Sequence, residues 1–278
     1  MAYTTINKSS EHFDTKIYTG NGSSQTLTMD NIGLLWMKRR DSSIRHCLFD
    51  SVRGGYYTGS GNAPLLESNT SSNAQGTDIN SAAKGITFGA TQTVIGNDSA
   101  GYSYNVNGHS MVGWQWRANG AGSANTDGSI NTTATSANTT AGFSISTYTG
   151  TGSASTVGHG LGAVPKMIIV KKISGASYSE SWYVYHEALG NTHALSLNST
   201  GASSDVNVWN DTTPTSSVFS VGNDSTNRSG NLFVAYCFAE KQGYSKFGSY
   251  KGNGNADGTF IYTGFKPAFV IAKLTSVG

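Results

Sequence analysis

Two copies of the tetrapeptide Gly-Asn-Asp-Ser, at residues 96–99 and 222–225, are the first places where chemistry could occur. An acid in such a segment could serve catalysis or bind calcium. A glycan-cleaving centre needs two facing carboxylates, however, and a calcium loop needs oxygen ligands at regular spacing. Asn and Asp also accept hydrogen bonds from nearby backbone amides in tight turns. We therefore expect turns of one recurring geometry, formed by Gly96, Asn97, Asp98, Gly222, Asn223 and Asp224.

The six histidines do not have the pattern of a metal site. His159 lies between glycines, and His186 and His193 follow a strand-like segment. Zinc requires three or four converging ligands, and the glycine-rich segments lack the Gly-Lys-Ser/Thr of a phosphate loop. The sequence predicts no catalytic residue, no metal and no cofactor, and we do not expect an enzyme.

Aromatic side chains are the remaining candidates for a binding role. An indole or phenol ring can stack on the apolar C–H face of a sugar, and the same ring can equally fill the core of a small sandwich. Both interpretations stay open here, with core packing favoured for strand residues. The residues in question are Trp114, Trp116, Trp182, Tyr183 and Trp209.

These residues must be positioned by a chain of 278 residues with a formal net charge of +2, which favours neither nucleic acid nor an anionic membrane as a partner. Only 12% of the residues are charged, and 35 are glycine. This composition is typical of short strands joined by many turns. No apolar run reaches the roughly 18 residues needed to cross a bilayer, so we expect no membrane insertion.

Internal repetition is the strongest signal in the sequence. Residues 18–22, 148–152 and 250–254 read YTGNG, YTGTG and YKGNG. Each is followed by a polar turn and an apolar segment that ends in a lysine, at Lys38, Lys171 and Lys273. The separations from tyrosine to lysine are 20, 23 and 23 residues, so the register is kept.

Two further blocks recur in the same order. CLFDSVRG of residues 47–54 aligns with YVYHEALG of residues 183–190, and MVGWQWRANG aligns with LFVAYCFAEKQG. The second alignment places Trp114 over Tyr236 and Trp116 over Phe238. Because apolar residues alternate with small or polar ones inside these blocks, they predict strands with one buried face.

The sequence therefore predicts an all-β fold of tandem antiparallel β-sandwich repeats, similar to jelly rolls. We expect an N-terminal attachment segment (1–16), a first repeat (17–120), a linker or long loop anchored only by Ile130 (121–143), a second repeat (144–246) and the start of a third (247–278). In the last segment, residues 259–265 and 267–274 read as two strands that need a surface to dock on.

The order of these blocks carries a resemblance to a known family. The phrases GYSKFGSYKGNGNADGTFIYTGFKPAFVIAKLT, SGNLFVAYCFAE and AGFSISTYTGTGSASTVGHGLGAVPKMIIVKK resemble the tandem β-rich repeats of tail-fibre-like proteins of marine and environmental bacteriophages. The opening MAYTTINKSSEHFDTKIYTGNG is similar to the start of such proteins. The resemblance implies a structural virion protein and supplies no catalytic residues.

We accordingly expect a structural component of a phage virion appendage, made in the host cytoplasm, that contributes to assembly and host-surface contact. A glycan-degrading tail-spike enzyme and a ligand-free capsid or tail decoration protein are the alternatives. The expected partners are identical chains, most simply in a trimer, other virion proteins through the N-terminus, and a host surface glycan. Trimers are expected because chains poor in large apolar residues gain core by wrapping around one axis.

Overall fold

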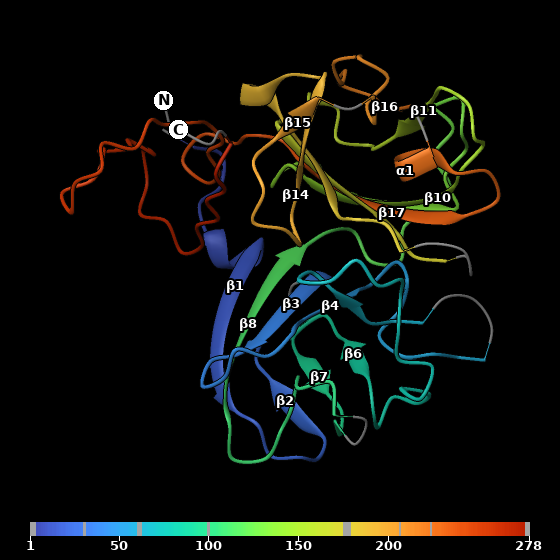
Figure 1. Ribbon diagram of the computed structural model, residues 1–278. Helices are drawn as coiled ribbons and strands as arrows, with labels where there is room; N and C mark the ends of the chain where they lie inside the picture. Colours follow the sequence, from blue (N-terminus) through green and yellow to red (C-terminus); the bar gives the residue numbers. More distant parts are fainter. Residues whose placement is uncertain are drawn as a thin grey trace.

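The computed structural model describes residues 4–29, 32–59, 63–98, 101–174, 179–205, 207–222 and 224–275. These residues form antiparallel sheets, which confirms the prediction of an all-β fold (Figure 1). The helical elements among them are single turns: η1 (Ser9–Glu11), η2 (Glu187–Leu189) and α1 (Asp224–Asn227).

The first half of the chain contains a large sheet and a small one. The large sheet has the order β1-β8-β3-β4-β5, and the small sheet the order β2-β7-β6. Their strands are β1 (Phe13–Thr19), β2 (Gln25–Leu27), β3 (Gly33–Arg39), β4 (His46–Asp50), β5 (Leu66–Glu67), β6 (Ile86–Phe88), β7 (Thr93–Ile95) and β8 (Ser110–Arg117). β1 begins inside the expected N-terminal attachment segment, whose residues 1–3 lie outside the described residues.

The second half has a large sheet in the order β15-β14-β13-β12-β17-β10-β9 and a small sheet of β11 and β16. The strands are β9 (Ala134–Asn138), β10 (Phe143–Thr149), β11 (Ser155–Gly158), β12 (Met167–Lys172), β13 (Tyr183–His186), β14 (His193–Ser196), β15 (Ser204–Asp205), β16 (Val218–Val221) and β17 (Leu232–Phe238). Figure 1 shows the two halves stacked one above the other.

The two large sheets share strand order and register. β8 lies between β1 and β3, and β17 lies between β10 and β12. Lys38 pairs with Val112 in the first sheet, and Lys171 pairs with Val234 in the second. The two lysines therefore occupy corresponding positions, as the spacing from the YTG motifs predicts.

Three apolar clusters make the molecule a stack of layers. One cluster, with Leu35 and Phe49, fills the space between the large and small sheets of the first half. A second, with Tyr148 and Phe219, does the same in the second half. The third joins Leu34 and Leu48 to side chains of the second large sheet, so the two large sheets pack face to face and share one core.

Polar contacts cross this shared core. Trp182 Nε1 donates to the backbone oxygens of Glu67 (3.0 Å) and Thr70 (3.1 Å), which belong to the other half. Tyr236 donates its hydroxyl to Asp50 Oδ2 at 2.8 Å. Buried polar groups without partners are costly, so these bonds fix how the halves sit on each other.

The segment of residues 121–143, expected to be a linker or long loop, is part of the second half instead. Its strand β9 pairs with β10 and forms an edge of the large sheet. Ile130 is buried and bridges to Val157, but it is not the single anchor that the sequence suggests, because Ala141 and Phe143 of the same segment are buried as well. The segment needs few apolar residues because backbone pairing and hydroxyl contacts, such as Thr135 Oγ1 to Ser146 Oγ at 2.9 Å, hold it in place.

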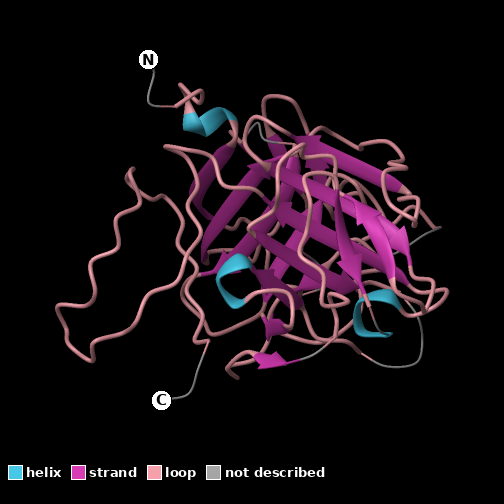
Figure 2. Ribbon diagram, turned by 90° about the horizontal axis from the view of Figure 1, so that it is seen from above, coloured by secondary structure: helices cyan, strands magenta, loops and turns pink. Residues whose placement is uncertain are grey.

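The C-terminal segment of residues 249–275 contains no strand, so the prediction of two strands at residues 259–265 and 267–274 is wrong for this chain (Figures 1 and 2). The segment projects from the body as a long loop and returns to the second half, where Lys273 Nζ donates to the backbone oxygens of Ser199 and Gly201. A strand needs a hydrogen-bonding neighbour, which no described residue supplies here.

Candidate functional site

Three adjacent strands of the first large sheet bring aromatic side chains onto one face. Trp114 and Trp116 are two residues apart on β8, so strand alternation places them on the same side. Trp36 of β3 pairs with Trp114, and Phe13 of β1 pairs with Trp116. We call these four residues the aromatic patch. It is built by cross-strand pairing, which is the usual unit of stabilisation in an antiparallel sheet.

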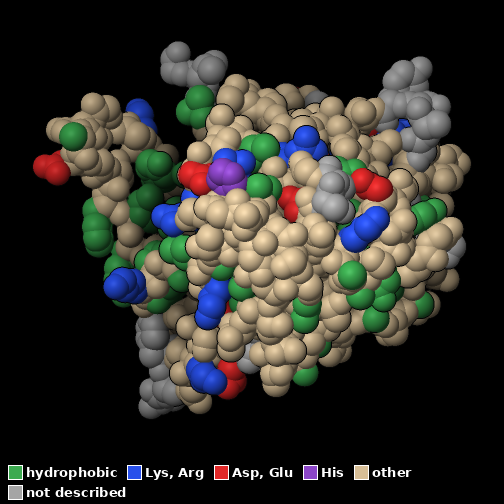
Figure 3. All heavy atoms as spheres, turned by 90° about the horizontal axis from the view of Figure 1, so that it is seen from below, with side chains coloured by type: hydrophobic (Ala, Val, Ile, Leu, Met, Phe, Trp, Pro, Cys, Tyr) green, Lys and Arg blue, Asp and Glu red, His purple; other side chains and the backbone are tan. Residues whose placement is uncertain are grey.

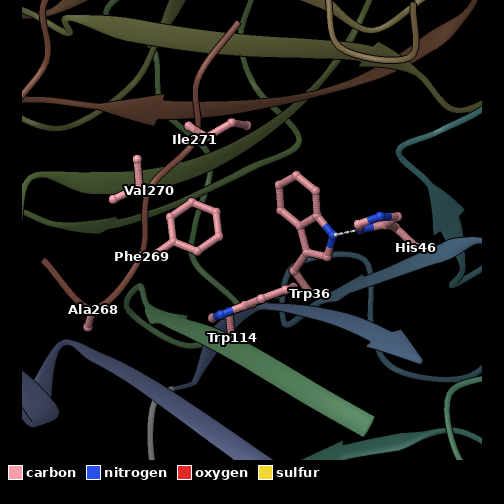
Figure 4. A pocket seen from close by; sticks show the side chains of 7 residues that line it. All are labelled: Trp36, His46, Trp114, Ala268, Phe269, Val270 and Ile271. Atoms are coloured by element: carbon pink, nitrogen blue, oxygen red, sulfur yellow. Dashed lines mark hydrogen bonds between the residues drawn. The ribbon is translucent and has the colours of Figure 1, made fainter. Parts of the chain in front are cut away.

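Part of the C-terminal segment closes over the aromatic patch. The ring centroid of Phe269 lies 5.1 Å from that of Trp116 and 5.5 Å from that of Trp114, with the rings edge to face. Beside these rings is a hollow of about 320 Å³, the aromatic groove. Figure 4 shows its lining, which consists of Trp36, His46, Trp114, Ala268, Phe269, Val270 and Ile271.

A single polar pair is fixed within the lining of the groove. Trp36 Nε1 donates to His46 Nδ1 at 2.9 Å, so the neutral imidazole carries its hydrogen on Nε2. Burial, helped by the charge of Lys38, lowers the pKa of His46 and keeps the ring neutral at pH 7. The groove therefore offers ring faces and apolar surface, which suit stacking on a flat apolar group such as a sugar face or an aromatic ring.

The structure divides the five aromatic residues that the sequence offers for sugar stacking. Trp114 and Trp116 lie in the aromatic patch, and Tyr183 is half-buried on β13. Trp182 and Trp209 are 0% and 2% exposed. A sugar could reach these two indoles only if the core opened, so sugar stacking is limited to the first three.

Trp36 belongs to the site although the sequence pattern did not single it out. It lies in the continuous apolar run GLLWMK, which has no alternation of apolar and polar residues to show on which face of the sheet each side chain lies. Its position two residues before Lys38 gives the missing information, because the register from lysine to β8 puts Trp36 opposite Trp114.

A buried asparagine clamps the first glycine loop. Asn105 accepts from Gly22 N with its backbone oxygen (3.0 Å) and from Asn21 N with Oδ1 (3.2 Å). The hydroxyl of Tyr18, the tyrosine of the YTG motif, donates to the backbone oxygen of Tyr104 at 2.6 Å. Asn105 is fully buried, and its side-chain amide also donates to the backbone oxygen of Ser23 at 2.7 Å.

The second glycine loop has the same clamp. Asn227 accepts from Gly152 N with its backbone oxygen (2.7 Å) and from Thr151 N with Oδ1 (2.8 Å). Tyr148 donates to the backbone oxygen of Thr226 at 2.7 Å. We call each set an asparagine clamp. The sequence does not reveal either clamp, because an asparagine between polar residues has the local pattern of an exposed turn.

The two Gly-Asn-Asp-Ser segments do not share one geometry. In the first, the Asp98 carboxylate accepts from the backbone amides of Tyr102 (2.8 Å) and Ser103 (2.6 Å), while burial raises its pKa. In the second, the helical turn α1 begins at Asp224, and Asn223 lies outside the described residues. The reason is length, since Gly96 precedes its clamp asparagine by nine residues and Gly222 by five.

Comparison with known families gives one match. The model of the family described as Domain of unknown function (DUF7483) matches residues 8–278. The chain belongs to this family. The matched range includes both halves and the C-terminal segment. No curated protein and no solved structure matches the chain.

The histidines of this family member serve local structure in the described part of the chain. His159 is fully buried, accepts from Leu161 N with Nδ1 and contacts the Thr215 backbone oxygen with Nε2. His186 Nδ1 accepts from Ala188 N at the start of η2. Among the described residues, no three His, Cys, Asp or Glu side chains come together in the manner of a metal site.

Buried carboxylates of the first half are held by arginines. Arg53 Nε donates to Asp50 Oδ2 at 2.6 Å in a pair that is almost fully buried. Arg45 Nη1 donates to Glu67 Oε1, also at 2.6 Å. Both carboxylates are thus engaged by an arginine, which is a structural use of the charge. No helix in the described ranges has the length and apolarity to span a membrane.

Proposed function

We propose that the chain is a structural component of a phage virion appendage, similar to a tail fibre, that acts in assembly and host-surface contact. The observation that carries the proposal is the exposed apolar C-terminal segment. Phe260 is 86% exposed, Val270 75% and Tyr262 74%. Figure 3 shows apolar side chains along the lobe that projects from the body at the left. A contiguous exposed apolar segment of this kind marks an interaction surface.

The proposed architecture is a pair of tandem jelly-roll-like sandwich repeats. Matching strand order, matching register and two asparagine clamps support it. The proposed location is the virion, with the amino-terminal residues contacting other virion proteins. The arginine-paired acids and the histidines engaged in local contacts favour this structural role over the tail-spike enzyme.

The proposed working state is a homo-oligomer, with a trimer as the simplest form. Sedimentation of the full chain over a range of concentrations tests it, with a triple variant that carries Phe260→Ser, Tyr262→Ser and Val270→Ser. The wild type should associate, and the triple variant should remain a monomer with an unchanged melting temperature. Ile17→Ser is the matched control, because Ile17 is 61% exposed but lies on β1. A wild-type chain that stays monomeric would overturn the oligomer.

A second candidate function is contact with a host surface glycan, favoured by the aromatic groove. Binding of the chain to a glycan array tests it, with Trp114→Ala as the variant and Tyr183→Ala as the control outside the groove. Loss of signal only in Trp114→Ala supports the groove as the glycan site. Equal signals would exclude it, and release of reducing ends from any bound glycan would favour the tail-spike alternative.

A further inference from the structure

The third copy of the glycine motif, at residues 250–254, has the backbone shape of the first two without their clamp. The last glycine of the motif has a φ of +68° at Gly22, +78° at Gly152 and +68° at Gly254. Tyr18 and Tyr148 are buried, whereas Tyr250 is 57% exposed. The loop is therefore shaped as in the clamped copies, while its tyrosine lies in solvent.

The first glycine of the motif shows most directly what is missing. A Cβ at Gly20 would lie 2.2 Å from Val106 O, and one at Gly150 would lie 2.3 Å from Arg228 O. Both oxygens belong to the residue that follows the clamp asparagine. At Gly252 a Cβ would meet nothing within 4 Å. Glycine is thus required at Gly20 and Gly150, because another backbone segment lies close to each. At Gly252 the glycine is present, but no backbone segment lies close to it.

The backbone segment that lies against Gly20 and Gly150 leads into the middle strand of each large sheet. In each half, the strand that carries the YTG motif (β1 or β10) and the strand that ends in the lysine (β3 or β12) lie on either side of one middle strand. This middle strand, β8 or β17, begins five residues after the clamp asparagine. The lysine register aligns Phe269 with Leu34 and Met167, so residues 269–273 are the third lysine segment. The C-terminal segment contains both flanking segments, and within the described residues no third middle strand lies between them.

We propose that residues 247–275 form an acceptor site for a β-strand of another polypeptide in the same assembly. The incoming strand carries an Asn-x-x-Gly clamp followed by alternating bulky residues, as β8 and β17 do. It pairs with the motif segment on one side and the lysine segment on the other, and its asparagine binds the loop of residues 250–254. This inference rests on the proposed structural function and names the chemistry of the partner.

A second copy of this chain is a poor donor, because its described middle strands are already paired. Each copy has two middle strands and three pairs of flanking segments, so an exchange between copies opens one site for each that it fills. The donor is therefore a strand other than β8 and β17. Its binding would bury Val270 and Ile271, which correspond to the fully buried Leu35 and the nearly buried Trp36 of β3.

The test uses the full chain and a synthetic peptide of residues 104–117, YNVNGHSMVGWQWR, which contains the first clamp and β8. Titration calorimetry should show one peptide bound per chain. A peptide with Asn105→Ala should bind at least about tenfold more weakly, since the loop loses the hydrogen bonds of the asparagine side chain and keeps only the one to its backbone oxygen. Hydrogen exchange of residues 247–275 should slow when the wild-type peptide is bound.

The matched protein variant is Gly252→Val. It leaves the free chain unaltered, because a Cβ at Gly252 meets nothing within 4 Å, yet it would collide with an incoming clamp as a Cβ at Gly20 or Gly150 would. We expect Gly252→Val to keep the wild-type melting temperature and to lose peptide binding. Absence of binding by the wild type, or equal binding by Gly252→Val, would overturn the acceptor site. Neither outcome bears on self-association, which sedimentation measures separately.

Discussion

The two large sheets have the same five-strand order but different edges. In the first sheet β1 is an edge strand, and its Ile17 is 61% exposed. In the second sheet the corresponding strand β10 is covered by β9. The covering strand β9 belongs to residues 121–143, whose composition is typical of a linker. An edge strand needs only backbone pairing and one solvated face, so a sequence nearly free of large apolar residues can supply it.

Two lysines at the corresponding position of the two large sheets differ in their exposure to solvent. Lys38 in the first half is partly exposed, and its Nζ donates to the backbone oxygens of Arg39 and Ser42. Lys171 in the second half is fully buried and donates to the backbone oxygens of Ser71 and Glu180. Burial, followed by the charge of Lys172, lowers the pKa of Lys171 to about 7. Packing the two halves together thus changed the environment of only one lysine.

The largest expected effect concerns the asparagine clamps. Asn105→Ala and Asn227→Ala should each lower the free energy of unfolding by about 4 kcal/mol, because each removes a fully buried side chain together with its hydrogen bonds to the loop backbone. Urea unfolding of both variants measures it, with the exposed Asn107→Ala as the control. Similar losses would support equivalent clamps. A loss below 1 kcal/mol in one variant, on the order of a single net hydrogen bond, would show that water replaces that asparagine.

A smaller effect is expected for the lysines, and it depends on pH. Between pH 7 and about 10 the unfolded chain binds a proton at Lys171 that the folded chain releases, so stability rises with pH in this window. Relative to Lys171→Met, the wild type should gain about 3 kcal/mol from pH 7 to pH 10. Lys38→Met should show a much smaller difference, since solvent reaches Lys38. Parallel pH profiles for wild type and Lys171→Met would mean that Lys171 stays charged when buried.

The smallest expected effect on stability concerns β1, which is an edge strand, and β10, which is covered by β9. Ile17→Lys should change the free energy of unfolding by less than about 0.5 kcal/mol, because the side chain is already in solvent. Thr147→Lys, at the corresponding position of β10, should cost about 1 kcal/mol, since Ala134 and Val234 flank it on both sides. Thermal unfolding of both variants decides it. A greater cost for Ile17→Lys would indicate that β1 is covered in solution.

Sequence alone predicted the strands that have one buried face and the register that the lysines mark. It did so because alternation and spacing are local properties of the chain. The asparagine clamps, Trp36 and β9 were missed for a common reason. Their roles depend on which distant segment lies opposite, and a buried asparagine has the same local pattern as an exposed one.

The C-terminal segment shows the opposite failure. Residues 259–265 and 267–274 have the composition of strands, and the structure leaves them unpaired. Strand propensity states what a segment can form when a neighbour is present, and it says nothing of whether the neighbour exists. The site was likewise predictable only in part, since Trp114 and Trp116 lie in the aromatic patch and Trp182 and Trp209 lie in the core.

The shared core has a consequence for counting. Each half covers one face of its large sheet with its own small sheet and leaves the other face bare, and the two bare faces cover each other. Two such halves bury all of their large-sheet faces when they pack together. In a solenoid, by contrast, every inner repeat needs a neighbour on both sides. The number of halves in an array therefore matters. When it is even, every large sheet can be covered by a partner, and when it is odd, one large sheet keeps an uncovered face.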